Sequence, residues 1–266
     1  MIEGKKVIDA HTHIYPAKIA AKAIAGTGKF YGIAPNELDG SPDTLLREDG
    51  MGGIDLSLVC SVATTPRQVS SINRYLASVA AEYPGQIEAI GTLHPESEDQ
   101  SADVEEAVSL GLRGVKLHPD IQGFRLDDER CMEIFALCEG RLPVLLHTGD
   151  KRYDYSNPNR LTTVLRAFPR LQVVGAHFGC YTVWEQAGDL RDFENLVVDC
   201  SSSLMYLTRE RTDELLNLYG SERVLFGTDY PMWHPSEEIR RFLELKLPGE
   251  TEEKILHKNA ERVFGL

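Results

Sequence analysis

The chain has 266 residues, of which 42% are hydrophobic, and its 28 basic and 41 acidic residues give a formal net charge of -13. This length suits one α/β barrel or two smaller domains. The negative charge argues against a nucleic acid or an anionic membrane surface as a partner. No stretch reaches the roughly 18 uninterrupted apolar residues of a membrane span. We therefore expect a cytoplasmic protein that acts on a small molecule, with a homodimer as the default oligomeric state.

Short β-branched runs alternate with longer segments of helical periodicity along the whole chain. Strands are predicted at residues 6–13, 56–62, 87–93, 114–118, 143–147, 172–177, 196–199 and 223–227. Helices are predicted at residues 72–83, 101–110, 129–139, 161–168, 182–192, 209–219 and 237–245. Strands that alternate with helices indicate a parallel sheet covered by helices. Eight such units in about 250 residues predict an α/β fold of the (β/α)8 TIM-barrel type, with residues 1–266 as a single domain.

The connections between these elements add three predictions. Helices are expected to end at Gly85, Gly111, Gly140 and Gly220. Residues 14–49 are too long for a simple connection, so they are predicted to form an extended, partly helical first loop over the site. The last helix is predicted at residues 251–264, with Thr251 as its N-cap. The five cysteines form no CxxC pair and are expected to be reduced packing residues.

Histidine or aspartate stands at the carboxyl end of four of the predicted strands. These residues are His11 and His13, His147, His177, and Asp229. A single histidine at a strand end is more often an ordinary polar residue of the rim. Four equivalent positions converge in a parallel barrel, however, and predict a divalent metal site in which His11, His13, His147 and Asp229 are the ligands. Asp9, on the same face as His11, is expected to fix the tautomer of an imidazole.

Three segments of the chain resemble the amidohydrolase superfamily. They are Asp9-Ala10-His11-Thr12-His13, Gly114-Val115-Lys116-Leu117-His118-Pro119 and Asn259-Ala260-Glu261-Arg262-Val263-Phe264. The likeness is to the amidohydrolase-related (amidohydrolase 2) branch, which includes aminocarboxymuconate semialdehyde decarboxylase, and it covers nearly the full length. It implies a distorted (β/α)8 barrel with metal-dependent chemistry at its carboxyl rim. By this resemblance His11, His13, His147 and Asp229 are metal ligands, and His177 is an acid or base or the ligand of a second metal.

The number of metal ions depends on Lys116, at the end of the fourth predicted strand. A carbamate on Lys116 would join His147 and His177 in a second metal site. An ammonium group would instead bind a substrate carboxylate or pair with an acid. His118 lies on the same face and could reach the cavity in either case. We favour one ion, with zinc as the first expectation and manganese, iron, cobalt or nickel as alternatives.

Because a metal site of this kind produces a bound hydroxide, the first predicted function is a hydrolase of a small amide, lactone or ester. The alternative is a metal-dependent, non-oxidative decarboxylase of an unsaturated or aromatic carboxylic acid. In both, Asp229 and His177 are the expected catalytic residues. A third hypothesis is a barrel without catalytic activity, in which the metal ion has a structural role. Arg152 and Tyr153, in the loop after the fifth strand, and Trp233, in an aromatic wall, are the expected substrate-binding residues.

Overall fold

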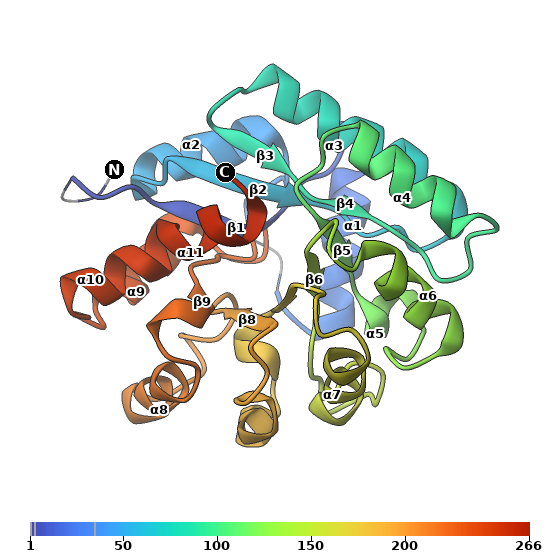
Figure 1. The fold of residues 1–266 in the computed structure, drawn as a ribbon. Coiled ribbons are helices and arrows are strands. Elements are labelled where there is room, and N and C mark those ends of the chain that lie inside the picture. The colour runs from blue at the N-terminus through green and yellow to red at the C-terminus, as the bar shows by residue number, and fades with distance from the viewer. Residues whose placement is uncertain (1, 3, 35) are drawn as a thin grey trace.

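The computed structural model describes residues 2, 4–34 and 36–266, and its centre is a ring of short parallel strands with helices outside (Figure 1). One sheet contains β1 (Ile8–His13), β2 (Leu56–Cys60) and β3 (Ile87–Ala89) in that order. A second sheet contains β4 (Gly91–Thr92), β5 (Val115–Leu117), β6 (Val144–Leu146), β7 (Val173–Gly175), β8 (Leu196–Asp199) and β9 (Val224–Leu225). All paired neighbours within the two sheets run parallel.

The third predicted strand is divided at Ile90, which is why the described residues form nine short strands and not eight. Backbone hydrogen bonds still carry the ring across this break. The Ile90 amide donates to the Val59 carbonyl over 2.8 Å, and the Gly91 amide donates to the Gly114 carbonyl over 2.9 Å. β3 and β4 therefore occupy a single strand position in the barrel.

The ring closes between β9 and β1. The Ala10 amide donates to the Phe226 carbonyl over 3.0 Å, and the Asp229 amide donates to the His11 carbonyl over 2.8 Å. Thr12 also forms a parallel bridge with Tyr230. The predicted (β/α)8 TIM barrel is thus confirmed, and its closure brings residue 229 beside residue 11.

Apolar side chains fill the inside of the barrel and the layer between strands and helices. Along β6, Leu145 belongs to the inner cluster, whereas Val144 and Leu146 belong to the outer one. This alternation follows from the two-residue period of a strand. Apolar side chains such as Ile8 and Val174 occupy the interior. A catalytic site in this barrel is therefore expected at the rim where the strands end.

The described α-helices are α1 (Ala17–Tyr31), α2 (Pro42–Gly52), α3 (Val69–Glu82), α4 (Gln100–Ser109), α5 (Pro119–Gln122), α6 (Glu129–Cys138), α7 (Pro158–Ala167), α8 (Arg209–Tyr219), α9 (Pro235–Leu243), α10 (Gly249–Glu253) and α11 (Asn259–Phe264). Most of them cover the outside of the ring, but α1 lies at the rim where the strands end, and α11 packs against the inner cluster. The predicted helix 209–219 coincides with α8. The four glycines expected to end helices, Gly85, Gly111, Gly140 and Gly220, all have positive φ. α1 and α2 occupy the long first loop, as expected.

Two of the predicted helices differ from the structure. Residues 182–192 contain the 3-10 helix η3 (Trp184–Leu190) in place of an α-helix. The terminal helix begins at Gly249 and not at a Thr251 cap, because the Pro248 carbonyl already accepts from the Glu252 amide over 2.9 Å. A π-helical turn (Lys254–Lys258) separates α10 from α11. Among the described residues, no helix is long and apolar enough to cross a membrane.

Candidate metal centre

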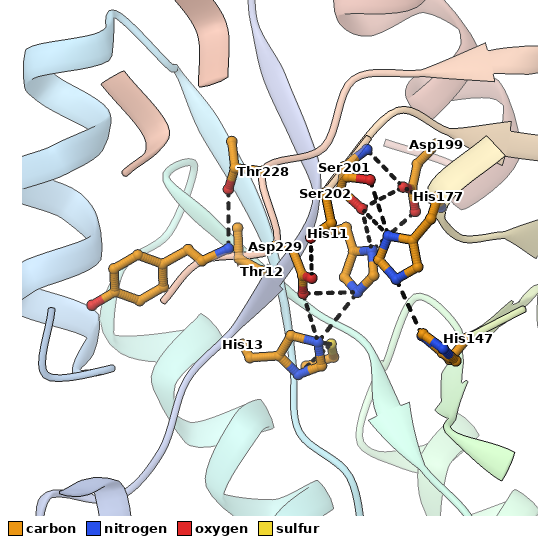
Figure 2. Close-up of polar contacts among 12 residues, drawn as sticks. His11, Thr12, His13, His147, His177, Asp199, Ser201, Ser202, Thr228 and Asp229 are labelled. Carbon is orange, nitrogen blue, oxygen red and sulfur yellow. Dashed lines mark hydrogen bonds and ion pairs between the residues drawn. The ribbon is translucent and has the colours of Figure 1, made fainter. Parts of the chain in front are cut away.

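Two imidazoles from β1 and one carboxylate from the segment after β9 meet at the rim of the barrel. His11 Nε2 lies 3.2 Å from His13 Nε2. Asp229 Oδ1 lies 3.6 Å from the first of these atoms and 3.4 Å from the second. Ligands held at 2.0–2.2 Å around a tetrahedral zinc ion are separated by about 3.3–3.6 Å. The three side chains that Figure 2 shows facing one another therefore fit a divalent cation.

Asp199 orients the first of these imidazoles. Its Oδ2 lies 3.0 Å from His11 Nδ1, and its Oδ1 accepts the backbone amides of His177 and Ser201. A proton on Nδ1 leaves the lone pair of Nε2 free for a metal, which is the usual role of such a carboxylate. Although burial opposes the charge of Asp199, the contact with His11 holds its pKa well below the usual range.

The prediction that Asp9 orients an imidazole was wrong. The Asp9 carboxylate accepts the backbone amides of His11 and Thr228, and the Thr228 hydroxyl, so it holds β1 to the end of β9. Asp9 precedes His11 along the strand and therefore lies deeper in the barrel. The signal for Asp199 was present, because this residue also ends an apolar run, Leu196-Val197-Val198.

Asp229 is held in a strained but well-supported position. Its φ is 62°, in the left-handed region that residues other than glycine rarely adopt. The Ser202 hydroxyl donates to Asp229 Oδ2 over 2.6 Å, and the Trp233 indole donates to the same Ser202 oxygen over 2.8 Å. Oδ1 is thereby left for the imidazoles. The sequence analysis missed Ser202, because only the fold brings it to Asp229.

Burial and neighbouring charges set the protonation of these groups. Burial opposes the charge of Asp229, but the imidazoles of His11 and His13 outweigh it and lower the pKa of this carboxyl. Burial and the nearby ammonium of Lys116 lower the pKa of His11 to about 4. Burial also opposes the charge of His13, but Cys60 and Asp229 raise its pKa to about 9. The centre thus presents an ionised carboxylate and one neutral imidazole at pH 7.

His147 and His177 form a second pair, on the neighbouring strand ends. His147 Nδ1 lies 3.1 Å from His177 Nε2, and His177 Nδ1 donates to the Ser201 carbonyl over 3.0 Å. His147 Nε2 lies 3.6 Å from Asp120 Oδ2, and its ring stacks on His118 with centroids 4.0 Å apart. Figure 2 shows His147 joined to His177, beyond His11. The role of His147 as a ligand beside His11, His13 and Asp229 therefore stays a prediction.

Lys116 is a buried cation beside the metal centre. It is 1% exposed, on β5, and its Nζ lies 3.0 Å from His11 Nε2. Desolvation lowers its pKa. This hydrogen bond places Lys116 at the first pair of imidazoles, and its charge also lowers the pKa values of His147 and His177. The carbamate that would bridge two metals therefore stays a prediction.

A cavity of about 910 Å³ opens from these side chains toward α1 and α3. The predicted residues His11, His13, Lys116, His118, His147, His177 and Asp229 all line it. Tyr31 of α1 lines it too, and its hydroxyl lies 2.7 Å from His118 Nε2. Tyr31 was not predicted from the sequence, because its contacts depend on how α1 crosses the rim of the barrel.

The three predicted substrate-binding residues do not line this cavity. Arg152 pairs with Asp150, with 2.6 Å between Nη2 and Oδ2, and its guanidinium lies over the Phe30 ring. Tyr153 stacks on the same ring. Trp233 is linked to Asp229 through the Ser202 hydroxyl. The structure thus gives these residues a supporting position around the site.

Comparisons with known proteins identify the family and the fold. A family model described as amidohydrolase matches residues 8–266. The 2-amino-3-carboxymuconate-6-semialdehyde decarboxylase of Dictyostelium discoideum is 24% identical over 340 aligned positions, which cover 97% of this chain and 91% of that protein. An uncharacterised TIM-barrel protein from Bordetella bronchiseptica is 27% identical, with a TM-score of 0.80 and 98% of each chain covered. A 5-carboxyvanillate decarboxylase from Novosphingobium aromaticivorans, complexed with manganese, is 16% identical, with a TM-score of 0.78 and coverage of 100% and 97%.

Proposed function

Because the chain belongs to the amidohydrolase family over residues 8–266, we propose that it is a metal-dependent decarboxylase of an unsaturated or aromatic carboxylic acid. The curated relative decarboxylates an unsaturated acid, as its name states, and several structural neighbours are named as decarboxylases of aromatic acids. This supports the second of the two functions that the sequence suggested. The hydrolase that the sequence analysis put first has less support.

The position of Lys116 carries the proposal. An ammonium group that is 1% exposed lines the cavity beside the imidazoles of the candidate metal centre. A buried cation is stabilised by an anion in contact with it. A substrate carboxylate that enters next to His11 would supply that anion. Binding of a substrate carboxylate by Lys116 favours its ammonium form over the carbamate, and a single metal ion over two.

The side chains divide the work of the reaction as follows. A divalent ion held by His11, His13 and Asp229 would supply Lewis acidity toward the oxygens of the substrate. Lys116 binds the carboxylate that will leave. Asp229, ionised in the resting site, takes up one proton from solvent and delivers it to the carbon that bears this carboxylate. The bond between that carbon and the carboxylate then breaks, its electron pair stays with the carbon skeleton, and carbon dioxide departs.

His177 has a defined tautomer in this scheme. Its Nδ1 donates to the Ser201 carbonyl, so its Nε2 is the unprotonated nitrogen and accepts from His147 Nδ1. Burial lowers the pKa values of both imidazoles, which keeps the pair uncharged. We assign to His177 the orientation of the substrate beside Asp229.

The test is a product assay on protein loaded with zinc or with manganese. Hydroxybenzoic acids, conjugated unsaturated acids, lactones and anilides are supplied in parallel, and carbon dioxide release is measured beside the appearance of new carboxylate. We expect carbon dioxide from an acid, and a loss of at least about 100-fold in Asp229→Asn. Hydrolysis of a lactone or anilide without carbon dioxide from any acid would contradict the proposal.

Zinc remains the first expectation for the metal, because neutral imidazole is a good zinc ligand. Manganese is the alternative, since it is bound in two of the similar structures. Elemental analysis of protein purified without added metal should give one ion per chain. A mass measurement that finds a carbamate on Lys116, together with two ions per chain, would overturn the single-ion assignment.

A further inference from the structure

The cavity is much larger than the metal centre at its base. Beyond the histidines it runs between α1 and α3 and is lined by apolar side chains, which we call the apolar chamber: Ile19, Ile24, Ile72, Tyr75, Ile121 and Met232. The volume of about 910 Å³ lies near the upper end of the usual range for small-molecule sites, about 300–1,000 Å³. A single-ring acid bound at Lys116 would leave the apolar chamber empty, so the chamber points to a longer apolar body.

The charge of the cavity wall is opposite to that of the chain. Among the residues that the structure describes, the lining includes three lysines, Lys18, Lys22 and Lys116, and a single carboxylate, Asp229, in a protein with a net charge of -13. Asp229 is already assigned to the metal. The remaining charged groups of the wall are therefore all cationic, which favours an anionic ligand.

Lys18 and Lys22 lie at the outer end of the cavity, where both are exposed. They are four residues apart on α1 and so project from the same face of the helix. α1 contains no acidic residue (Ala17–Tyr31, AKIAAKAIAGTGKFY). No ion pair involves either lysine within the described residues. Lys116 is buried at the other end, so cationic groups stand at both ends of the apolar chamber.

We propose that the substrate is a diacid with an extended apolar body. The reacting carboxylate binds at Lys116, the apolar body fills the apolar chamber, and the second anionic group meets Lys18 and Lys22 at the mouth. The identity of the reacting end rests on the decarboxylase proposed above. The binding of a diacid does not require turnover, so it can be tested by itself.

The binding test uses three probes titrated calorimetrically into the metal-loaded protein: benzoate, biphenylcarboxylate, and a biphenyl dicarboxylate with its acids at opposite ends. We expect the second ring to tighten binding by about tenfold or more, because it buries apolar surface in the chamber. The second carboxylate should add about threefold to tenfold, the range of exposed ion pairs. Equal affinities for all three acids would overturn the proposal.

Matched variants separate the two parts of this site. The double change Lys18→Gln and Lys22→Gln should remove only the gain from the second carboxylate. Lys29→Gln, on the same helix but outside the cavity lining, should keep it. An equal loss in Lys29→Gln would show a general effect of charge and refute the role of Lys18 and Lys22.

The apolar chamber has its own pair of variants. Ile72→Trp should fill the chamber and abolish the gain from the second ring, while benzoate still binds as before. Val108→Trp, at an exposed position on α4, should leave all three affinities unchanged. If Ile72→Trp binds biphenylcarboxylate as tightly as the unsubstituted protein does, the chamber is not the binding site. Carbon dioxide release is measured separately, so failure of the binding series leaves the decarboxylase proposal intact.

Discussion

Asp199 Oδ2 lies 3.0 Å from His11 Nδ1, and the two side chains are 0% and 1% exposed. Since one nitrogen of a neutral imidazole must carry the proton, this contact assigns it to Nδ1 and frees Nε2 toward His13 and Asp229. A carboxylate from β8 thus prepares an imidazole on β1 to bind a metal, across the barrel closure that joins β9 to β1.

Asp199→Asn should weaken metal binding by about 10-fold to 100-fold, the usual effect of losing such a partner. The reason is that the amide cannot stabilise the imidazole as a carboxylate does. Competition with a chelator, followed by elemental analysis, measures the change. Asp192→Asn, at a side chain that is 87% exposed, is the matched control and should bind metal normally. Unchanged affinity in Asp199→Asn would mean that His11 needs no orienting group.

Gly227→Ala should damage the same centre from the other side of the barrel closure. A Cβ atom at this position would lie 3.0 Å from His11 Cβ, whereas one at Gly188 would meet nothing within 4 Å. We therefore expect Gly227→Ala to lose stability by about 1–3 kcal/mol, as overpacked sites do, and to bind metal more weakly. Gly188→Ala should change neither property. Thermal unfolding with and without metal measures both, and equal behaviour of the two variants would refute the steric argument.

The strand ends explain how far the sequence could predict this site. His11, His13, His147, His177 and Asp229 follow apolar runs, so a parallel barrel brings them to one rim, where the structure places them. Their mutual contacts depend on side-chain rotation, which no sequence pattern indicates: His147 Nδ1 lies 3.1 Å from His177 Nε2, and the role of His147 as a metal ligand stays a prediction. Tyr31 ends α1 and Ser202 lies in the turn after β8; tertiary packing sets where both segments cross the rim, so no local pattern could indicate their contacts.

Burial raises the pKa of Asp49 to about 7, far above its model-peptide value of 3.8. As the pH rises, Asp49 loses its proton near pH 4 in the unfolded chain but only near pH 7 in the folded protein. The folded state therefore holds one extra proton between about pH 4 and pH 7. Stability is therefore lost as the pH rises through this window, with a slope of at most about 1.4 kcal/mol per pH unit. At pH 8 the free energy of unfolding is lowered by the full cost of ionising the buried Asp49 carboxyl.

Asp49→Asn should remove this dependence, because an amide oxygen can still accept the hydrogen bond from Ser57. We expect the variant to melt at a higher temperature than the unsubstituted protein at pH 8, and the gain to vanish below pH 4. The exposed Asp39 is the control, since burial opposes its ionisation only weakly and Ser41 lowers its pKa. Asp39→Asn should gain no stability as the pH rises. A gain for Asp49→Asn that is the same at every pH would contradict the assignment.

Arg152 contacts the end of α1, and we expect these contacts to hold the helix over the cavity. Its guanidinium lies 4.7 Å from the Phe30 ring centroid and 5.1 Å from that of Tyr31, and it donates to the Phe30 carbonyl. Arg152→Gln should therefore speed amide hydrogen exchange across α1 while leaving the barrel strands protected. Arg74→Gln removes an exposed ion pair with Glu106 and should leave α1 unchanged.

The same variant separates this supporting role from the substrate contact that the sequence suggested for Arg152. If Arg152 acts through α1, Arg152→Gln should weaken both biphenylcarboxylate and the biphenyl dicarboxylate, because their apolar bodies contact α1 residues such as Ile19 and Ile24, and should leave benzoate unchanged. A direct contact with an anionic group would instead weaken the dicarboxylate most. Selective loss of the dicarboxylate, with unchanged exchange in α1, would return Arg152 to the substrate site and would move the second anion away from Lys18 and Lys22.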